Sequence, residues 1–457
     1  MDKLDYTELS GMNLYQGVRG HAVKILNRVD RTDAYLDKLL EIELKNSNLS
    51  GVDKALLFEI VHGVMRWMGR LDWILTGFYK GQFSKSVSDV KNALRVALYQ
   101  ILFLDKIPDY AAVNEAVEFI KKLQGQKYAD IANAVLRNII RNKDSIRYPD
   151  PEEDLIGYLS AYYSHPAWMV KRWFKRFGKE ETEKLLIANN SKPVLSLRVN
   201  NLVTSLDELK SLLDSVELKY TISKYLPEFI RLNKLTNITD WEYFQKGFFS
   251  VQDESSGLPV KLLDVKPGMR VLDLCAAPGG KTAFIADIMN NQGEIIAIDR
   301  YESRLKILEK NLTRLKVTNV KTLAINALDF NDNEGFDRVL VDAPCSGLGT
   351  LTKKPDLKWK KDLGDIRKII NIQYELLKKG SSMLKVGGSL VYSTCTIEPE
   401  ENFEIIKRFL AENPNFTLVD ASEIFPKELL DENGCVQTYP HIHGIDGSFA
   451  AKIIRLV

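Results

Sequence analysis

The chain has 457 residues, and its 63 lysines and arginines nearly balance its 61 aspartates and glutamates, which gives a formal net charge of +2 at pH 7. This length exceeds one ordinary hydrophobic core, so about two or three domains are expected. The charge balance excludes a chain that is basic throughout, and any nucleic-acid-binding surface must be local. Neither an apolar run of about 18 residues nor a signal-peptide pattern occurs, which predicts a cytoplasmic protein without a membrane partner.

Cysteine is sparse in this sequence. Cys275, Cys345, Cys395 and Cys435 are too few for a disulfide framework and lack the paired spacing of a zinc site. We therefore expect reduced thiols and no metal ion.

The N-terminal part is predicted to be entirely helical. Apolar residues recur at helical spacing from Tyr15 to Asn142, and no strand pattern intervenes. Ser50 followed by Asp53 is typical of a helix N-terminus. His21 and His62 lack neighbouring metal ligands, so we expect both to be structural.

A connection and a small α+β module are predicted next. Prolines in residues 148–151 oppose helix formation, and residues 165–180, HPAWMVKRWFKRFGKE, then interleave aromatic and basic side chains at helical spacing. That segment fits an RNA-binding face and an ordinary amphipathic helix equally well. A strand over 194–200, a helix over 206–213 and a strand over 229–232 predict the module.

Residues 270–300, RVLDLCAAPGGKTAFIADIMNNQGEIIAIDR, predict a strand, a helix and a second strand. Gly279 and Gly280 lie at the first turn, where open α/β sheets bind nucleotide-like ligands beside a helix N-terminus. Asp299 ends the second strand 19 positions after Gly280, close to the interval of about 20 residues at which a carboxylate binds ribose hydroxyls. The ligand should therefore contain an unphosphorylated ribose.

The sequence of this turn does not match the motifs of two other kinds of nucleotide-binding site. A phosphate-binding P-loop needs glycine where the chain has Cys275, and a dinucleotide site needs G-x-G-x-x-G, whereas only Gly279 and Gly280 are present. S-adenosylmethionine has a ribose and no phosphate, so it is the expected cofactor.

Strands and helices continue to alternate beyond Arg300, which predicts a doubly wound sheet. Residues 448–456 resemble an additional edge strand. The other elements expected here are strands over 321–325, 338–341 and 389–392 and helices over 304–315, 366–384 and 402–410.

A cysteine follows each of two apolar strands of this region. Cys345 stands in Asp342-Ala343-Pro344-Cys345 and Cys395 in Tyr392-Ser393-Thr394-Cys395, so both thiols should lie at the carboxyl edge of the sheet. A methyl donor needs a thiolate when the acceptor is C5 of cytosine, because sulfur addition at C6 makes C5 nucleophilic. Asp342 would hold the N3 and amine edge of the ring, and Lys281 would fix that carboxylate or lower a thiol pKa.

The segments LCAAPGGKT, IDR, DAPCSGLG, YSTCT and HGIDGSFAAKI together resemble the motifs of the Sun family of RNA cytosine-C5 methyltransferases, from about Val251 to the C-terminus. The resemblance implies a Rossmann-like catalytic domain, with Cys395 as the nucleophile. It links Cys345 to product release and Asp342 to cytosine handling, with Lys281 as a further catalytic candidate.

The same resemblance implies a cofactor site for S-adenosyl-L-methionine. This chain departs from the family at Asn326, where an aspartate is usual near the adenine; an asparagine carbonyl still accepts a hydrogen bond. The implied cofactor-binding residues are Cys275, Ala276, Ala277, Pro278, Gly279, Gly280, Lys281, Asp299, Arg300, Asn326 and Asp342.

The segments DKALLFEIVHGVMRW, ALYQILFLDKIP, AVNEAV and NAVLRN are similar to the NusB-like RNA-binding domain. A NusB-like domain joined to this catalytic domain is typical of the RsmB/Sun-type family, which implies 16S rRNA as partner and a monomeric enzyme. The domains expected are 13–147 (all-α, NusB-like), 148–245 (linker helices and α+β module) and 246–457 (methyltransferase). Two alternatives remain open: a tRNA substrate, and a non-catalytic RNA-binding assembly factor that has kept the fold.

A second basic run lies close in sequence to Cys345. Residues 353–361 contain five lysines and Trp359, and this composition beside the expected active site favours contact with RNA phosphates.

Overall fold

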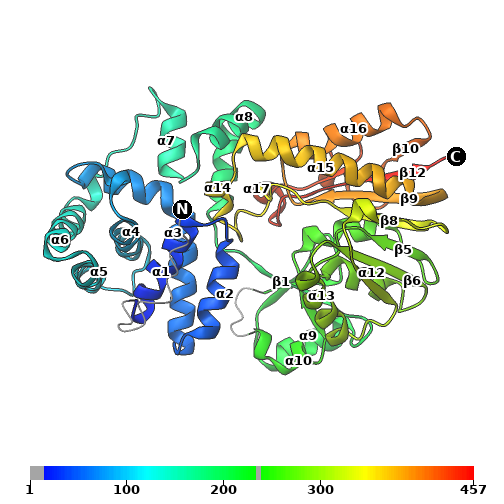
Figure 1. Cartoon of the computed structure of the whole chain (residues 1–457), viewed down its shortest axis with the longest axis horizontal. Coiled ribbons are helices and arrows are strands. Elements are labelled where there is room, and N and C mark those ends of the chain that lie inside the picture. The colour runs from blue at the N-terminus through cyan, green and yellow to red at the C-terminus, as the bar shows by residue number, and fades with distance from the viewer. Residues whose placement is uncertain (1–14, 233–237) are drawn as a thin grey trace. The chain divides into compact units, whose positions relative to one another are not determined.

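The computed structural model describes residues 15–232 and 238–457 (Figure 1). These residues form two compact units. The first comprises the described residues up to Asn190 together with Lys354–Lys360, and the second contains the rest. None of the described helices combines the length and the apolar character that a membrane crossing requires.

The first unit is built from helices, and its described residues contain no strand, which confirms the all-α prediction. Ser50 accepts a hydrogen bond from the backbone N–H of Asp53, so the predicted helix start is also confirmed. Its α-helices are α1 (Gly17–Arg31), α2 (Leu36–Asn46), α3 (Gly51–Phe78), α4 (Ser88–Phe103), α5 (Asp109–Gln124), α6 (Gln126–Arg141), α7 (Leu155–Tyr162), α8 (Ala167–Asn189) and α14 (Leu357–Lys360).

Helix α8 contains the aromatic and basic segment. Trp173 is only 1% exposed, so this aromatic belongs to the core and cannot stack on a base in this structure. Gly178 has a φ of +76° and interrupts the helix after Phe177.

The two histidines of the first unit each contact a carboxylate of α2. Nδ1 of His21 lies 2.6 Å from Glu43, and Nε2 of His62 lies 3.2 Å from Asp37.

The second unit begins with a four-stranded antiparallel sheet in the order β2-β3-β1-β4. Helix α9 (Leu206–Ser215) packs leucines against this sheet, as the module prediction requires. Two of its strands were absent from the sequence prediction, because they have only three residues each. The strands are β1 (Leu195–Val199), β2 (Tyr220–Ile222), β3 (Phe229–Leu232) and β4 (Phe249–Val251).

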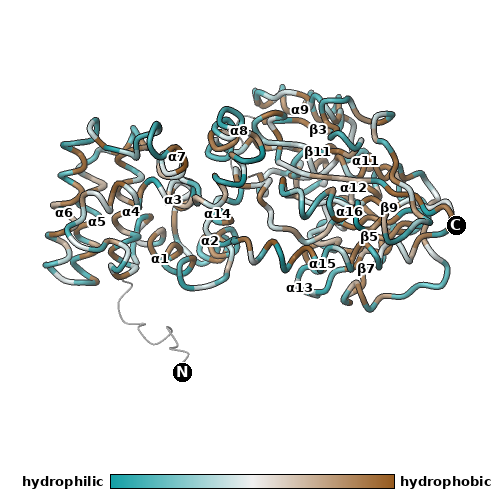
Figure 2. Tube along the Cα trace, turned by 90° about the horizontal axis from the view of Figure 1, so that it is seen from above, coloured by the Kyte–Doolittle hydropathy of each residue, from teal (hydrophilic) through white to brown (hydrophobic). Residues whose placement is uncertain are grey.

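A larger mixed sheet follows, in the order β10-β12-β9-β8-β5-β6-β7, with β11 paired to β12. Strands β9, β8, β5, β6 and β7 are parallel, and apolar residues are buried along β5, β6, β8 and β9, whereas β7 is partly exposed. Figure 2 shows hydrophobic residues in brown around β5 and β9. The strands are β5 (Arg270–Asp273), β6 (Glu294–Asp299), β7 (Val320–Ala324), β8 (Phe336–Asp342), β9 (Leu384–Thr394), β10 (Phe416–Val419), β11 (Val436–Gln437) and β12 (Phe449–Arg455).

The prediction of an edge strand at the C-terminus was wrong in its position. Strand β12 lies inside the sheet and pairs antiparallel with both β9 and β10. The reason is that β10 adds a further strand outside it.

The order of the strands defines where a ligand can bind. From β5 the chain adds β6 and then β7 on one side of the sheet. It then crosses over and adds β8 and β9 on the other side of β5. Neighbours β5 and β8 therefore form the topological switch point, where a crevice opens beyond the carboxyl ends of parallel strands. Helices α12 (Gly280–Ile288), α13 (Glu302–Arg314), α15 (Leu363–Ser382) and α16 (Phe403–Glu412) connect or flank these strands.

Candidate active site

The turn after β5 needs glycine at one position. Gly279 has a φ of +98°, in the left-handed region, and a Cβ there would lie 2.8 Å from Cγ of Leu308. Helix α12 starts at the next residue, so its free N–H groups face the switch-point crevice. Glycine is therefore required at position 279 by the left-handed backbone and by the packing of Leu308.

Asp299 ends β6 beside this turn and is 4% exposed. Its Oδ1 accepts a hydrogen bond from the N–H of Tyr301 at 3.0 Å, and its Oδ2 lies 3.0 Å from Nη1 of Arg304. Arg304 also donates to the carbonyl of Ala277 at 2.6 Å. Arg304 therefore links the carboxylate to the glycine turn, a role that the sequence analysis missed because arginine at this helix position has no spacing signature.

Arg300 and Asn326 lie at the same edge of the sheet. Arg300 follows β6 and is exposed, and Asn326 follows β7 two residues after its end. The side chain of Asn326 accepts a hydrogen bond from the N–H of Leu328 at 3.4 Å, so it caps the short turn there.

The register between β8 and β9 brings the two cysteine segments together. Asp342 pairs with Ser393 at the ends of these parallel strands. Cys345 follows Asp342 by three residues, and Cys395 follows Ser393 by two. The Sγ atoms of the two cysteines lie 2.8 Å apart, and the N–H of Cys395 donates to Sγ of Cys345 at 3.3 Å. All four cysteines are reduced, and both of these are partly exposed.

Asp342 is held from two sides. Its Oδ2 lies 2.7 Å from Nζ of Lys281, and its Oδ1 accepts a hydrogen bond from Oγ of Ser393 at 2.9 Å. Lys281 is on the first turn of α12, so it connects the glycine turn to the end of β8. The structure thereby brings together Lys281, Asp342, Cys345 and Cys395, which the sequence placed on three separate segments.

The electrostatic environment distinguishes the thiols. The hydrogen bond with Cys395 and burial raise the pKa of Cys345, and burial raises the pKa of Cys275. Burial alone would lower the pKa of Lys281, but Asp342 and Cys395 hold it above its ordinary value. Lys281 therefore stays charged beside Asp342 and Cys395, and the raised pKa values of Cys345 and Cys275 keep these two groups as thiols.

Two lysines of the basic run after Cys345 do not contribute to the expected phosphate-binding surface. Lys358 is completely buried in the first unit, where its Nζ donates to the carbonyls of Arg66 (2.7 Å) and Ser164 (2.9 Å) and to Oδ1 of Asn190 (3.0 Å). Lys353, in the second unit, forms ion pairs with Asp253 and Asp446. A buried or paired ammonium cannot neutralise phosphate, so the prediction was wrong for these two lysines.

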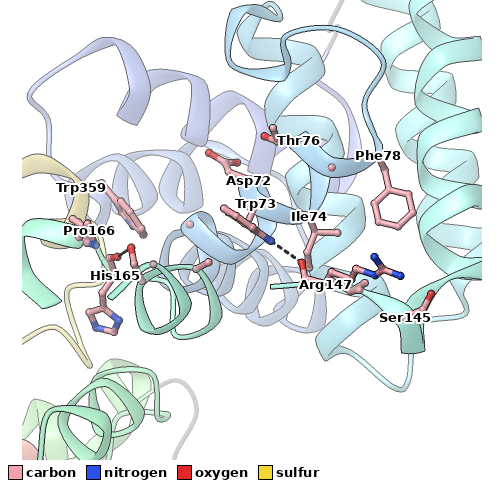
Figure 3. A pocket seen from close by; sticks show the side chains of 17 residues that line it. Asp72, Trp73, Ile74, Thr76, Phe78, Ser145, Arg147, His165, Pro166 and Trp359 are labelled. Carbon is pink, nitrogen blue, oxygen red and sulfur yellow. Dashed lines mark hydrogen bonds between the residues drawn. The ribbon is translucent and has the colours of Figure 1, made fainter. Parts of the chain in front are cut away.

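A cavity of about 750 Å³ lies in the first unit (Figure 3). Trp73 and Trp359 line it, and the indole N–H of Trp73 donates to the carbonyl of Arg147 at 2.9 Å. None of the predicted catalytic or cofactor-binding residues lines this cavity, so it is separate from the site at the strand ends.

The fold and the site define an α/β domain with a glycine turn, a buried aspartate and a pair of thiols at the carboxyl ends of its parallel strands. Residues 260–454 match the family described as "16S rRNA methyltransferase RsmB/F". Residues 16–141 match "NusB family", and residues 165–239 match "Methyltr_RsmF/B-like, ferredoxin-like domain".

Known proteins resemble the chain over almost all of its length. The "Probable ribosomal RNA small subunit methyltransferase B" of Bacillus subtilis (strain 168) is 36% identical over 443 residues, covering 95% of this chain and 98% of that protein. The "Ribosomal RNA small subunit methyltransferase B" of Vibrio vulnificus (strain YJ016) is 33% identical over 442 residues, covering 96% and 99%.

Solved structures agree with these relatives. The crystal structure of PH0851 has a TM-score of 0.81 and 27% identity, covering 97% of this chain and 99% of that one. The crystal structure of NSun6 from Pyrococcus horikoshii with SFG has a TM-score of 0.58 and 26% identity, covering 64% and 98%. The chain belongs to the RsmB/F family of S-adenosylmethionine-dependent rRNA cytosine methyltransferases, with an N-terminal NusB domain and a ferredoxin-like module.

Proposed function

We propose that this chain transfers a methyl group from S-adenosyl-L-methionine to C5 of a cytosine in 16S rRNA, through a covalent bond between Cys395 and C6. The observation that carries the proposal is the pair of thiols 2.8 Å apart beside the Lys281–Asp342 ion pair. An oxygen or amine acceptor would need no such thiols, because it is already nucleophilic.

The residues of the crevice fit the cofactor. Helix α12 starts directly after the glycine turn, so its N-terminal N–H groups are available to a ligand, and the carboxylate of Asp299 is aligned by two donors beside that turn. The cofactor-binding set is Cys275–Lys281 with Asp299, Arg300, Asn326 and Asp342. When bound there, S-adenosylmethionine supplies an electrophilic methyl group.

The residues of this chain account for the remaining steps. The Cys395 sulfur forms a bond to C6, and the electron pair of the C5–C6 double bond makes C5 the nucleophile for the methyl group. Asp342, held by Lys281 and Ser393, accepts hydrogen bonds from the amine of the ring and from N3, which takes up a proton as sulfur adds and loses it again when sulfur leaves. A base then takes the C5 proton, the double bond re-forms, and sulfur leaves with its electron pair. Cys345, next to that sulfur, serves product release.

The RNA partner is proposed from the relatives, whose names specify the small ribosomal subunit. The target cytosine must leave its base stack to reach Cys395, so a single-stranded or loop region is the expected substrate. We assign RNA binding to the NusB-like residues 13–147, connection to 148–245 and catalysis to 246–457, acting as a monomer. Neither a tRNA substrate nor a purely structural role is favoured by a specific contact.

Bisulfite sequencing of total RNA tests the proposal. Cells that lack this protein should lose one 5-methylcytosine in 16S rRNA, and the wild-type chain should restore it. The Cys395→Ser variant should bind S-adenosylmethionine in calorimetry and fail to restore the modification. A lost site in tRNA, or an unchanged 16S rRNA, would contradict the assignment.

A further inference from the structure

Glu401 is a buried acid that the steps above do not use. It ends the short helix η6 (Pro399–Glu401), six residues after Cys395, and its side chain is completely buried. Its carboxylate accepts hydrogen bonds from the N–H of Ser346 at 2.8 Å, from the hydroxyl of Ser346, and from Nε2 of Gln373 at 3.0 Å. Among the ion pairs of the described residues, none involves Glu401.

These contacts join the two cysteine segments. Ser346 follows Cys345 directly, and its hydroxyl also lies 2.9 Å from Oγ1 of Thr396, the residue after Cys395. Gln373, on α15, donates both to Glu401 and to the carbonyl of Pro344 at 2.9 Å. The residues on either side of Cys345 are therefore tied to one carboxylate that belongs to the Cys395 segment.

Stability does not explain an acid at this position. A buried carboxylate without a cation loses its hydration, and burial raises the pKa of Glu401 above its ordinary value. An apolar residue of similar volume would avoid that desolvation. What the carboxylate adds is four acceptor directions, which allow it to hold several donors from different segments at once.

We propose that Glu401 is a positioning residue for methyl transfer: its carboxylate clamps the Cys345 loop to the Cys395 turn and so sets the separation of the two thiols. The role extends the proposed function, on which it rests. A loosened clamp leaves both thiols present but misplaced, and a displacement of about 1 Å in an active site costs on the order of 100-fold in rate.

Variants of Glu401 separate the effect of its hydrogen bonds from the effect of its charge. In Glu401→Gln, the remaining oxygen accepts from the Ser346 N–H and from Gln373, while the new amide donates to the hydroxyls of Ser346 and Thr396. The bridge is then kept without the charge. Glu401→Ala removes the bridge altogether, and Gln373→Met removes the part of it that reaches Pro344.

The experiment measures kcat and KM for wild type and variants, with S-adenosylmethionine affinity and melting temperature as checks of folding. We expect kcat of Glu401→Gln to stay within about 3-fold, and kcat of Glu401→Ala to fall about 10- to 100-fold with both KM values nearly unchanged. The kcat of Gln373→Met should also fall. This variant serves as the test if Glu401→Ala does not fold. The matched control is Glu404→Gln, an exposed glutamate in the adjoining helix, which should behave as wild type.

A second readout needs neither RNA nor cofactor. Iodoacetamide labelling, followed by mass spectrometry, should modify Cys345 several-fold faster in Glu401→Ala than in wild type and equally fast in Glu401→Gln. If wild type produces no 5-methylcytosine, the proposed function fails, while this labelling still tests the clamp. The clamp is overturned if folded Glu401→Ala keeps wild-type kcat and labelling, if only its KM values or stability change, or if Glu401→Gln is as inactive as Glu401→Ala.

Discussion

The sulfur atoms of Cys345 and Cys395 lie 2.8 Å apart, although the two residues are separated by 50 positions in the sequence. Parallel pairing of β8 with β9 creates this proximity, because it aligns Asp342 with Ser393 at the strand ends. Both thiols are therefore close enough to meet the same substrate base, as the proposed mechanism requires.

This proximity predicts a disulfide under oxidation. Diamide, a two-electron oxidant, should take both thiol hydrogens and leave Cys345 and Cys395 covalently joined, which abolishes methyl transfer until dithiothreitol restores the thiols. Peptide mapping by mass spectrometry detects the bond. Cys435, which is buried, should remain reduced as an internal control, and a Cys275–Cys395 bond instead would contradict the observed pairing.

Lys281 is predicted to act through Asp342 and Cys395. Lys281→Met leaves the Asp342 carboxylate without its cation and removes the positive charge next to the nucleophile, so the single-turnover rate should fall about 100-fold or more. The single-turnover rate of Asp342→Asn should fall by a similar factor. The rate of the double variant should be only slightly lower than that of either single variant, because the two side chains act as a unit. Additive losses would show that they act independently.

Asp273 predicts a pH dependence of stability. Burial raises its pKa to about 7, and Oγ1 of Thr282 donates to it at 2.8 Å. The folded chain therefore keeps this proton to a higher pH than the unfolded chain, so its stabilising contribution is complete below about pH 4 and is lost as pH rises through about 7. The melting temperature of Asp273→Asn, relative to wild type, should rise between pH 5.5 and pH 8. A constant difference would mean that Asp273 does not titrate in this range.

Lys358 is predicted to stabilise the first unit and not to bind RNA. Lys358→Met leaves two buried carbonyls and the Asn190 side chain without their donor, which should cost about 2 kcal/mol or more of unfolding free energy. The exposed Lys354 in the same segment supplies the control, and Lys354→Ala should change stability by less than about 0.5 kcal/mol. A steep change in the salt dependence of RNA affinity for Lys358→Met, without loss of stability, would restore the phosphate-contact hypothesis.

Much of the catalytic domain could be predicted from the sequence because most of its parallel strands are buried and read as short apolar runs. Strands β5, β6, β7, β8 and β9 follow from such runs, and their turns carry the site residues. Strand β12 was also recognised, but its internal position depends on β10, whose four partly exposed residues have no clear pattern.

Side-chain partners were harder to predict than elements. The charge of Lys358 suggested a phosphate contact, whereas the structure surrounds it with carbonyls from three distant segments. Arg304 and Glu401 belong to no motif that the sequence analysis used. Their contacts are made with segments far away in the sequence, so they are visible only in the folded chain. Lys281, Asp342 and the two cysteines were found because each follows a strand or opens a helix at the switch point.

The most direct test of the central claim is to capture the bond between Cys395 and cytosine. Purified Cys345→Ala, incubated with 16S rRNA and S-adenosylmethionine, should accumulate a denaturation-resistant protein–RNA adduct, because addition proceeds while product release is blocked. The double variant Cys345→Ala, Cys395→Ser should form none, and digestion should recover the adduct on the peptide that contains Cys395. An adduct that persists without Cys395, or methylation at the wild-type rate by Cys395→Ser alone, would contradict the account.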